Sequence, residues 1–276
     1  MGVCVITGGA GGMGIAIARM QGKEHDLLLV DVSQVKLDAA LETLREDGIQ
    51  AATAVCDISD RGCVQALAER AAAMGEISAV IHTAGLSPTM APAPRIVQVN
   101  ALGTYYIIEE FFKVMGEDSS MVTVASLATH MMARNAGESI HAVVDHPDDP
   151  DFEKRLNKLI DSMAAPGSTP AAGAAYSVSK YFSWRYTRRN VLRFWSKGIR
   201  INCVTPGNIA TPMGKAEEAG CARTAAHMAI KRYGTPEEIA AAVAFLTSAA
   251  AGDTTGADLP VDGGFCCCTS FPQVGA

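Results

Sequence analysis

Tyr176 and Lys180 are the first two residues whose types and spacing suggest chemistry. In a helix, side chains four positions apart lie on one face. An ammonium group beside a phenol favours the phenolate, which brings the pKa of the tyrosine closer to the value that a general base needs near neutral pH. The pattern alone is also typical of ordinary surface neighbours, so it indicates catalysis only where other motifs accompany it. We predict that a long helix opens at Tyr176 and runs to about Lys197.

A glycine-rich turn follows the first apolar run of the chain. Its residues, Thr7-Gly8-Gly9-Ala10-Gly11-Gly12-Met13-Gly14, lead directly into a helical pattern. In a strand–turn–helix unit, glycines let the backbone approach a pyrophosphate, and the helix N-terminus offers free N–H groups. We therefore expect a dinucleotide at this turn, contacted by Gly8, Gly11, Gly12, Met13 and Gly14. A tight connection without a ligand is the alternative.

Two acidic residues stand at further positions expected of a dinucleotide site. Asp31 ends the second apolar run, seventeen residues after Gly14, where a carboxylate accepts both adenosine ribose hydroxyls and repels a 2′-phosphate. It predicts NAD rather than NADP, although Asp31 could instead help to cap a helix at Ser33. Asp57 and Ile58 follow the third apolar run, where they would meet an adenine edge or simply begin a helix.

These residues need a scaffold, and short apolar runs alternating with helical patterns predict one. The expected strands are Val3 to Thr7, Leu27 to Val30, Ala51 to Cys56, Ala79 to His82, Met121 to Ala125 and Ile199 to Val204. Between them, Ser33 to Asp47 and Ser59 to Met74 read as helices opened by a capping serine. The alternation predicts a doubly wound parallel α/β sheet in one domain, with its ligand beyond the carboxyl ends of the strands.

One stretch, about residues 129–174, interrupts this alternation. It contains the acidic turn Asp145-His146-Pro147-Asp148-Asp149-Pro150 and an amphipathic pattern in which Asp151 is available as a cap. The apolar positions of that pattern are Phe152, Leu156, Leu159, Ile160 and Met163. We predict a helical insertion that packs back onto the domain, and we expect the acidic turn to be solvated rather than to hold a metal.

Composition narrows the partners and the setting. The net charge of −6 offers no positive surface for a polyanion, so we expect neither nucleic acid nor a membrane surface as partner. The chain has no basic, apolar leader and no run of about 18 apolar residues, which predicts a cytoplasmic protein. Its eight cysteines lack the spacing of zinc sites or of a disulfide framework, so we expect reduced thiols, mostly in the core.

Three further motifs occur in a fixed order after the Tyr-x-x-x-Lys pair. They are Pro206-Gly207-Asn208-Ile209-Ala210-Thr211-Pro212-Met213, Arg232 to Ala240, and Thr254-Thr255-Gly256 through Val261-Asp262-Gly263-Gly264. Together with the glycine turn and the tyrosine–lysine pair, they resemble the motifs of the short-chain dehydrogenase/reductase family from Val3 to Gly264. The resemblance implies a Rossmann-type fold and an oxidoreductase that interconverts an alcohol and a ketone with a nicotinamide cofactor.

The resemblance also implies roles for individual residues. Ser126 matches the serine that hydrogen-bonds the substrate oxygen, and Asn100 matches the asparagine that holds a water between the lysine and solvent. Tyr176 would exchange the hydroxyl proton while Lys180 holds the nicotinamide ribose. The remaining expected cofactor contacts are Ala84, Gly85, Pro206, Gly207, Ile209 and Thr211.

Three departures from the family pattern bear on these roles. His82-Thr83-Ala84-Gly85 stands where Asn-Asn-Ala-Gly is common, and we expect His82 to be a packed strand-end residue. Ser126 and Tyr176 lie fifty residues apart instead of about a dozen, so the insertion must return the chain to Ser126. Only fifteen residues separate Gly85 from Asn100, which shortens the helix before Asn100.

The short helix, the insertion and the tail at 265–276 resemble bacterial 3α-hydroxysteroid dehydrogenase/carbonyl reductases. We therefore expect a hydroxysteroid or bile-acid alcohol, held by an apolar, methionine-rich pocket. Its candidate residues are Leu86, Pro88, Met90, Leu127, Met131, Met132, Met213 and Met228. A sugar, polyol or acyl ketone is the enzymatic alternative, and a non-catalytic nucleotide sensor is the alternative of another class. Members of the family usually associate through the helices of Asn100 and Tyr176, so a homodimer or homotetramer is expected.

Overall fold

The computed structural model describes residues 1–164 and 170–271 and contains one seven-stranded parallel sheet in the order β3-β2-β1-β4-β5-β6-β7. The strands are β1 (Val3–Thr7), β2 (Asp26–Asp31), β3 (Ala51–Val55), β4 (Ile77–His82), β5 (Ser120–Val124), β6 (Arg200–Pro206) and β7 (Asp258–Val261). The strand order reverses between β1 and β4, and a ligand is expected beyond the carboxyl ends at such a point. The predicted doubly wound α/β sheet is confirmed.

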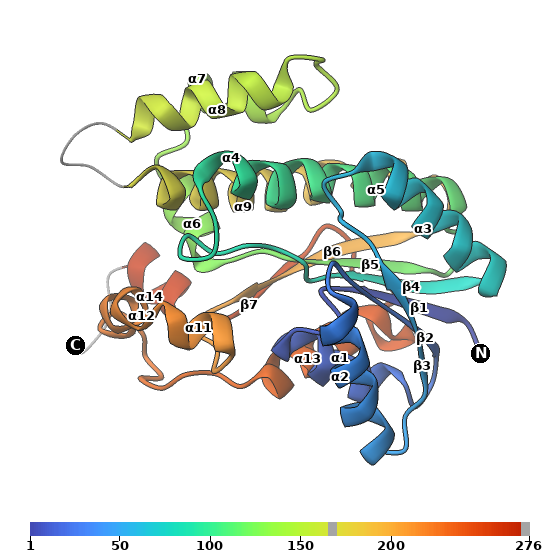
Figure 1. The fold of residues 1–276 in the computed structure, drawn as a ribbon. Helices are drawn as coiled ribbons and strands as arrows, with labels where there is room; N and C mark the ends of the chain where they lie inside the picture. The colour runs from blue at the N-terminus through green and yellow to red at the C-terminus, as the bar shows by residue number, and fades with distance from the viewer. Residues whose placement is uncertain (165–169, 272–276) are drawn as a thin grey trace.

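Helices cover both faces of this sheet (Figure 1). They are α1 (Gly12–Gln21), α2 (Gln34–Glu46), α3 (Arg61–Met74), α4 (Ala93–Ile96), the π-helix η1 (Val97–Leu102), α5 (Gly103–Val114), α6 (Leu127–Ala133), α7 (Glu138–Val144), α8 (Phe152–Met163), α9 (Ala171–Arg189), α10 (Val191–Trp195), α11 (Pro212–Ala216), α12 (Glu218–Ala225), α13 (Pro236–Thr247), the 3-10 helix η2 (Ala249–Ala251) and α14 (Phe265–Ser270). In Figure 1, α1, α2 and α13 lie on one face, and α3, α5 and α9 lie on the other.

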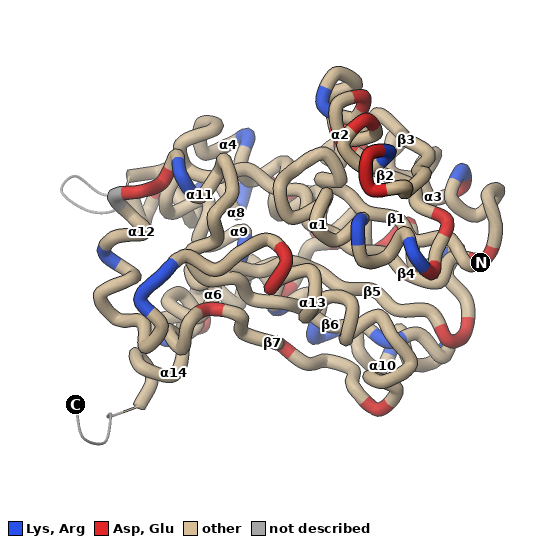
Figure 2. The backbone as a smooth tube through the Cα atoms, turned by 90° about the horizontal axis from the view of Figure 1, so that it is seen from below, with Lys and Arg blue, Asp and Glu red and all other residues tan. Residues whose placement is uncertain are grey.

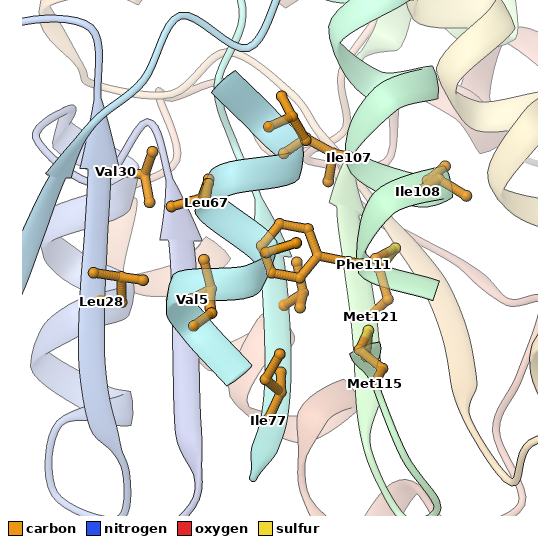
Figure 3. Close-up of a cluster of buried hydrophobic side chains, with 14 of the residues drawn as sticks. Val5, Leu28, Val30, Leu67, Ile77, Ile107, Ile108, Phe111, Met115 and Met121 are labelled. Atoms are coloured by element: carbon orange, nitrogen blue, oxygen red, sulfur yellow. The ribbon is translucent and has the colours of Figure 1, made fainter. Parts of the chain in front are cut away.

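The core lies between the sheet and these two helical layers. Figure 3 shows Phe111 of α5 and Leu67 of α3 packed above Val5 of β1 and Leu28 of β2. β1 and β5 are buried along their whole length, as strands of a sheet covered on both faces must be. Their near-continuous apolar sequences are therefore what made these strands visible in the sequence.

Helix beginnings were predicted less well than strands. The Ser33 side chain caps α2 by accepting from the amide of Lys36, as expected. The prediction that Ser59 caps α3 is wrong, because the Asp60 carboxylate accepts from the amides of Gly62 and Cys63 instead. The Ser59 hydroxyl is engaged with Asp57, which leaves the adjacent carboxylate as the cap.

The helix of Tyr176 also differs from its prediction at both ends. It begins at Ala171, so Tyr176 lies in its second turn, and it ends at Arg189 rather than near Lys197. Asn190 separates it from the short helix α10. The side-chain amide of Asn190 donates to the carbonyl of Tyr186, a local side-chain bond of the kind that competes with regular helix.

The insertion contains three helices rather than the one that the sequence suggested. α8 begins after Asp151, whose side chain makes no capping hydrogen bond, so the predicted cap is wrong. The buried Phe152, Leu156 and Ile160 join a cluster with Val178 and Phe182 of α9. Figure 1 shows α7 and α8 as an outer layer over α9. The acidic turn is ion-paired to the domain, since Asp145 lies 2.5 Å from Arg185 and 2.7 Å from Arg189. Residues 165–169, near the end of the predicted insertion, lie outside the described part of the chain.

Two C-terminal elements were not predicted from the sequence. β7 pairs with β6 at the edge of the sheet, and its sequence Asp-Leu-Pro-Val is too short and too mixed to stand out. α14 follows the Asp262-Gly263-Gly264 turn, where both glycines have positive φ. The helix is fixed by Asp262, whose carboxylate accepts from the amides of Gly264 and Cys266.

Charged residues are spread along the chain rather than gathered on one surface. In the view of Figure 2, lysines and arginines alternate with aspartates and glutamates over the tube. All eight cysteines are free thiols, and Cys4, Cys56, Cys203 and Cys221 are buried. Within residues 1–164 and 170–271, every helix is too short or too polar to cross a bilayer.

Candidate active site

Ser126 and Tyr176 meet in space despite the fifty residues between them. The Tyr176 hydroxyl donates to Oγ of Ser126 at 3.2 Å. Ser126 stands at the end of β5, where its extended backbone makes it the N-cap of α6, and its Oγ also accepts from the amide of Ala128. Tyr176 reaches it from α9, so a strand end and a helix face supply the two hydroxyls. The structure thus meets the condition that the insertion return the chain to Ser126.

Lys180 lies one helical turn beyond Tyr176 and is buried, with 8% of its surface exposed. Its ammonium group donates to the carbonyl of Val124 at 2.8 Å, which ties α9 to the end of β5. Burial lowers the pKa of Lys180 to about 8, because the charged form loses solvation. The remaining ammonium hydrogens are available to neighbouring acceptors.

The pKa of Tyr176 runs against the expectation from its lysine neighbour. Burial raises the pKa of Tyr176 to about 12, the hydrogen bond with Ser126 lowers it, and the charges of Glu217 and Cys221 raise it further. The expected shift toward phenolate is therefore wrong for the chain by itself, because burial outweighs the hydrogen bond with Ser126. An additional positive charge close to the phenol is needed to make it a base at neutral pH.

Asn100 lies in the π-helix η1 and faces the same region. Its side chain accepts from the amide of Leu86 at 2.7 Å and donates to the Leu86 carbonyl at 2.9 Å. A Cβ at Gly85 would stand 3.3 Å from Oδ1 of Asn100 and 3.5 Å from Nζ of Lys180. Gly85 therefore lies beside both groups, and because it has no side chain, the Asn100 amide and the Lys180 ammonium group can both stand close to its backbone.

The backbone carbonyl of Asn100 is bound by two hydroxyl groups. Oγ1 of Thr104 donates to it at 2.7 Å and Oγ of Ser183 at 3.1 Å. A π-turn disturbs the regular carbonyl acceptors of a helix, and side-chain hydroxyls are one way to satisfy them. Neither residue was predicted from the sequence, since isolated threonines and serines in helices are common.

His82 is buried, as expected of a packed strand-end residue, and it connects the cofactor turn to Asn100. Its Nδ1 lies 2.7 Å from Oγ1 of Thr7, and its Nε2 lies 3.0 Å from Oγ1 of Thr104. Because Thr104 donates its proton to the Asn100 carbonyl, the ring must donate through Nε2 and accept at Nδ1. Burial first, and then the charge of Lys180, lower the pKa of His82 to about 3, so the ring is neutral.

The glycine turn has the shape of a phosphate cradle. Gly8 has φ of +66°, and a Cβ there would stand 2.7 Å from Oγ1 of Thr83. A Cβ at Gly14 would collide with the carbonyl of Gly8. α1 begins at Gly12 after Gly11, which has no side chain with which to cap it, and its first turn carries no acidic residue. The free amide hydrogens of that turn fit a pyrophosphate.

Asp31 and Asp57 both lie at strand ends beside this turn. Oδ1 of Asp31 accepts from the amide of Ser33 at 3.2 Å, so the capping alternative is realised by one carboxylate oxygen. The Asp57 carboxylate is bound by Ser59 and by Arg95, whose Nη2 lies 2.7 Å from Oδ2. A contact of the Asp57 carboxylate with adenine would compete with these bonds, whereas Ile58 is buried next to it.

The segment after β6 closes the site from the other side. Thr211 caps α11 by accepting from the amide of Gly214. Ile209 is buried and its backbone bridges to Gly234. A Cβ at Gly12 would stand 3.2 Å from Cγ2 of Thr211, so the cofactor turn and this segment lie against each other. Gly207 packs on Asp262, where a Cβ would stand 2.7 Å from the aspartate Cα.

Beside Ser126, three apolar side chains from distant segments form a small cluster of Leu127, Met228 and Phe265. Leu127 and Met228 were predicted for the pocket, whereas Phe265 of α14 was missed because its segment appeared only as a tail. Met132 belongs instead to the core beneath the insertion, and Met90 and Met131 are half exposed. The apolar lining is thus smaller than the sequence suggested.

Glu217 is a further residue that the sequence analysis missed. It lies between α11 and α12, and its negative charge acts on the Tyr176 phenol. Among the described residues, its buried Oε1 has no hydrogen-bond partner. No motif marks this residue, and only the folded arrangement brings its carboxylate toward the reacting groups.

Comparison with known proteins agrees with this arrangement. Residues 2–138 match the family model described as short chain dehydrogenase, and residues 159–266 match the model described as enoyl-(acyl carrier protein) reductase. A short-chain dehydrogenase/reductase of Alternaria brassicicola is 33% identical over 93% of this chain and 93% of its own. The chain therefore belongs to the short-chain dehydrogenase/reductase family, whose members use a nicotinamide cofactor.

Two further relatives illustrate the range of the family. The 3beta-hydroxysteroid dehydrogenase 2 of Eggerthella lenta is 28% identical, over 95% of this chain and 93% of its own. The crystal structure of a short-chain dehydrogenase/reductase from Brucella melitensis, described as glucose/ribitol dehydrogenase, is 27% identical with a TM-score of 0.73 and covers 96% of both chains. Alcohols of quite different polarity are thus named among its relatives.

Proposed function

We propose that the protein is an NAD(H)-dependent oxidoreductase that interconverts a cyclic secondary alcohol and its ketone, with a hydroxysteroid or bile-acid alcohol as the first candidate. The single observation that carries the reaction type is the 3.2 Å contact between the hydroxyls of Tyr176 and Ser126, with Lys180 one turn away. Two hydroxyls that converge in this way can bind the same substrate oxygen: one donates a hydrogen bond to it, and the other accepts its proton.

The proposed roles follow from the geometry of the chain. The alcohol oxygen takes the place between Tyr176 and Ser126, Ser126 donates a hydrogen bond to it, and Tyr176 accepts its proton. NAD, held by the glycine turn and Lys180, would supply the hydride acceptor, and its positive charge would favour the phenolate. Lys180 adds a second positive charge close to the phenol and holds a ribose hydroxyl. The proton then leaves past Lys180 and Asn100, and ketone reduction runs through the same groups in reverse.

NAD is proposed over NADP because of Asp31. Its carboxylate ends β2 at the edge of the phosphate cradle, where a 2′-phosphate would meet a like charge.

The cytoplasm is the proposed setting, since all eight cysteines are free thiols. The proposed cofactor contacts are the cradle residues Gly8, Gly11, Gly12, Met13 and Gly14, with Ile58, Ala84, Gly85, Pro206, Gly207, Ile209 and Thr211 around the rest of the molecule.

The apolar cluster of Leu127, Met228 and Phe265 supports a ring-containing substrate. Its member Leu127 directly follows Ser126 in the sequence, so we expect the cluster to contact the carbons flanking the reacting centre. The relative named as a hydroxysteroid dehydrogenase is consistent with such a substrate. These residues would bind mainly by burying apolar surface.

Glu217 favours a second candidate, a polyol or sugar alcohol. A buried carboxylate oxygen without a partner is costly, and a second substrate hydroxyl could satisfy it. The relative described as glucose/ribitol dehydrogenase is consistent with this reading. A nucleotide sensor without turnover is disfavoured, because it has no need for the converging hydroxyls of Ser126 and Tyr176.

A substrate panel with NAD and NADP tests the proposal. We expect NADH formation with hydroxysteroids of defined position, and weaker or no formation with galactitol and ribitol. Turnover of the polyols alone would replace the steroid candidate by the second one. Absence of turnover with every alcohol and every corresponding ketone, in protein that binds NADH, would contradict an enzymatic function.

A further inference from the structure

Asp258 of β7 makes contacts that the reaction scheme does not use. Its Oδ2 lies 2.7 Å from Nε2 of His130 and accepts from Nε1 of Trp184 at 2.9 Å. Its Oδ1 accepts from the hydroxyl of Thr205 at 2.7 Å. One carboxylate at the sheet edge therefore joins α6 and α9 through one oxygen and β6 through the other.

The two partners of Oδ2 stand in register with the two reacting hydroxyls. His130 lies one helical turn after Ser126, and Trp184 lies two turns after Tyr176 on the face that also carries Lys180. The pair Ser126–Tyr176 and the pair His130–Trp184 are thus successive contacts between the same two elements. The rings of His130 and Trp184 also meet edge to face, with centroids 6.0 Å apart.

This position matters because α6 leads directly into the insertion. In a chain with a dozen residues between the serine and the tyrosine, the short connection itself would limit how far they separate. Here the two residues lie fifty positions apart, so α6 needs its own attachment to α9. Asp258, His130 and Trp184 supply that attachment one turn beyond Ser126.

The contacts of the Asp258 carboxylate favour its charged form. Its side chain is 9% exposed, and burial raises its pKa, but the close contact with His130 and the hydrogen bonds from Thr205 and Trp184 outweigh burial and lower it. The His130 contact is close but not well aligned as a hydrogen bond, so its contribution is that of an ion pair when the imidazole is protonated. Arg188 stacks on the Trp184 ring, with its guanidinium carbon 4.6 Å from the centroid, and so fixes the indole from its other side.

From these contacts we infer that His130 and Trp184, joined by Asp258, are positioning residues that hold α6 on α9 and thereby keep Ser126 against Tyr176. Neither residue is among those proposed to contact substrate or cofactor. The inference rests on the proposed catalytic roles of Ser126 and Tyr176. It also predicts that weakening the attachment lowers kcat only because it displaces Ser126.

The test combines His130→Ala with a second change at Ser126. His130→Ala should lower kcat about 10-fold or more, as small misplacements of reacting groups do, without changing the affinity for NADH measured by fluorescence titration. His130→Gln, whose amide can still reach Oδ2, should recover part of the loss. In a Ser126→Ala background, which has its own lower rate, His130→Ala should cause no further loss.

A histidine elsewhere in the insertion provides the matched control. His141 of α7 also bonds α9, through a 2.9 Å contact with the hydroxyl of Tyr181. His141→Ala removes a comparable attachment but leaves α6 in place, so kcat should equal that of the parent. An equal loss of kcat in both variants would indicate general loosening and would overturn the inference.

Hydrogen–deuterium exchange separates this inference from the proposed function. His130→Ala should accelerate amide exchange at 127–130 at least several-fold, with or without a known substrate. An unchanged kcat, or a loss of the same size in the Ser126→Ala background, would overturn the positioning role. If His130→Ala does not fold, Trp184→Phe replaces it in the test. This change keeps an aromatic side chain and removes one hydrogen bond, and the same results are expected. If the parent turns over no alcohol, the proposed function fails while the exchange rates still decide whether the attachment holds α6.

Discussion

At the scale of single residues, the site combines two groups whose pKa values are shifted in opposite directions by burial. Burial raises the pKa of Tyr176 to about 12 and lowers that of Lys180 to about 8, so near neutral pH the phenol keeps its proton while the lysine still carries its charge. The chain by itself therefore keeps the proton on the phenol. Binding of a positively charged nicotinamide is what would turn the phenol into a base.

The choice of cofactor depends on Asp31. Replacing Asp31 by Ser removes the charge that opposes a 2′-phosphate while keeping a polar cap for the amide of Ser33. The kcat/KM ratio of NAD to NADP should fall about 10- to 100-fold, which corresponds to about 1.4 to 2.8 kcal/mol. Steady-state rates with both cofactors measure it. A parent enzyme that already prefers NADP would contradict the prediction.

His82 should make stability depend on pH in a defined window. Its folded pKa is about 3, against 6.5 for the ordinary side chain, so the unfolded chain takes up a proton that the folded chain refuses. Stability is therefore lost as the pH falls from about 6.5 toward 3, at a rate of up to about 1.4 kcal/mol per pH unit.

Urea unfolding of the parent and of His82→Gln between pH 4 and 7 measures this effect. The variant lacks the titrating ring, so its stability should fall less steeply over that interval, whatever its absolute value. Parallel curves for the two proteins would mean that His82 titrates normally in the folded state.

At the scale of elements, buried strands were predictable and boundaries set by tertiary contacts were not. The apolar runs of β1 and β5 could be read directly, because both faces of a parallel sheet are covered. β7, α6 and α7 are short, and their sequences carry little periodicity. They form because tertiary contacts hold them, such as the pairing of β7 with β6 and the packing of α6 on α9.

The same distinction applies to the site. Tyr176, Lys180 and the glycine turn are fixed by local spacing, so sequence alone located them. Phe265 and Glu217 arrive from segments far along the chain, and only packing brings them toward Ser126 and Tyr176. The direction of the Tyr176 pKa shift was also wrong, because burial is a property of the fold and not of a motif.

The insertion should contribute its own share of stability through α8. Phe152 is 2% exposed, and its ring lies 5.2 Å from that of Phe182 in α9. Phe152→Ala should destabilise the protein by about 3 to 5 kcal/mol in chemical unfolding. Lys154→Ala, at a mostly exposed position of the same helix, should change little. Equal effects of the two changes would show that α8 does not pack on α9 in solution.

At the scale of the whole molecule, the insertion bears on how copies associate. Helices α7 and α8 form a layer over α9, and α8 packs on both α9 and η1 (Figure 1). The resemblance to the family led us to expect association through the helices that carry Asn100 and Tyr176. Part of that surface is covered here by the chain's own residues, so we propose a dimer formed through another face.

Light scattering at several concentrations tests this proposal. The expected mass is twice the 28.9 kDa of one chain, without growth as the concentration rises. A stable species of four chains would contradict it, since the covered surface would then have to be open or replaced by an interface involving the insertion.

The most direct test of the account is the rate of hydride transfer in Tyr176→Phe at saturating NAD and alcohol. Removing the phenolic oxygen leaves the ring, the cradle and Lys180 in place, so NAD should still bind while kcat falls about 10²- to 10⁴-fold. A variant that binds NAD and turns over alcohol at the parent rate would show that the proton passes elsewhere. The convergence of Tyr176 and Ser126 would then not be the centre of the reaction.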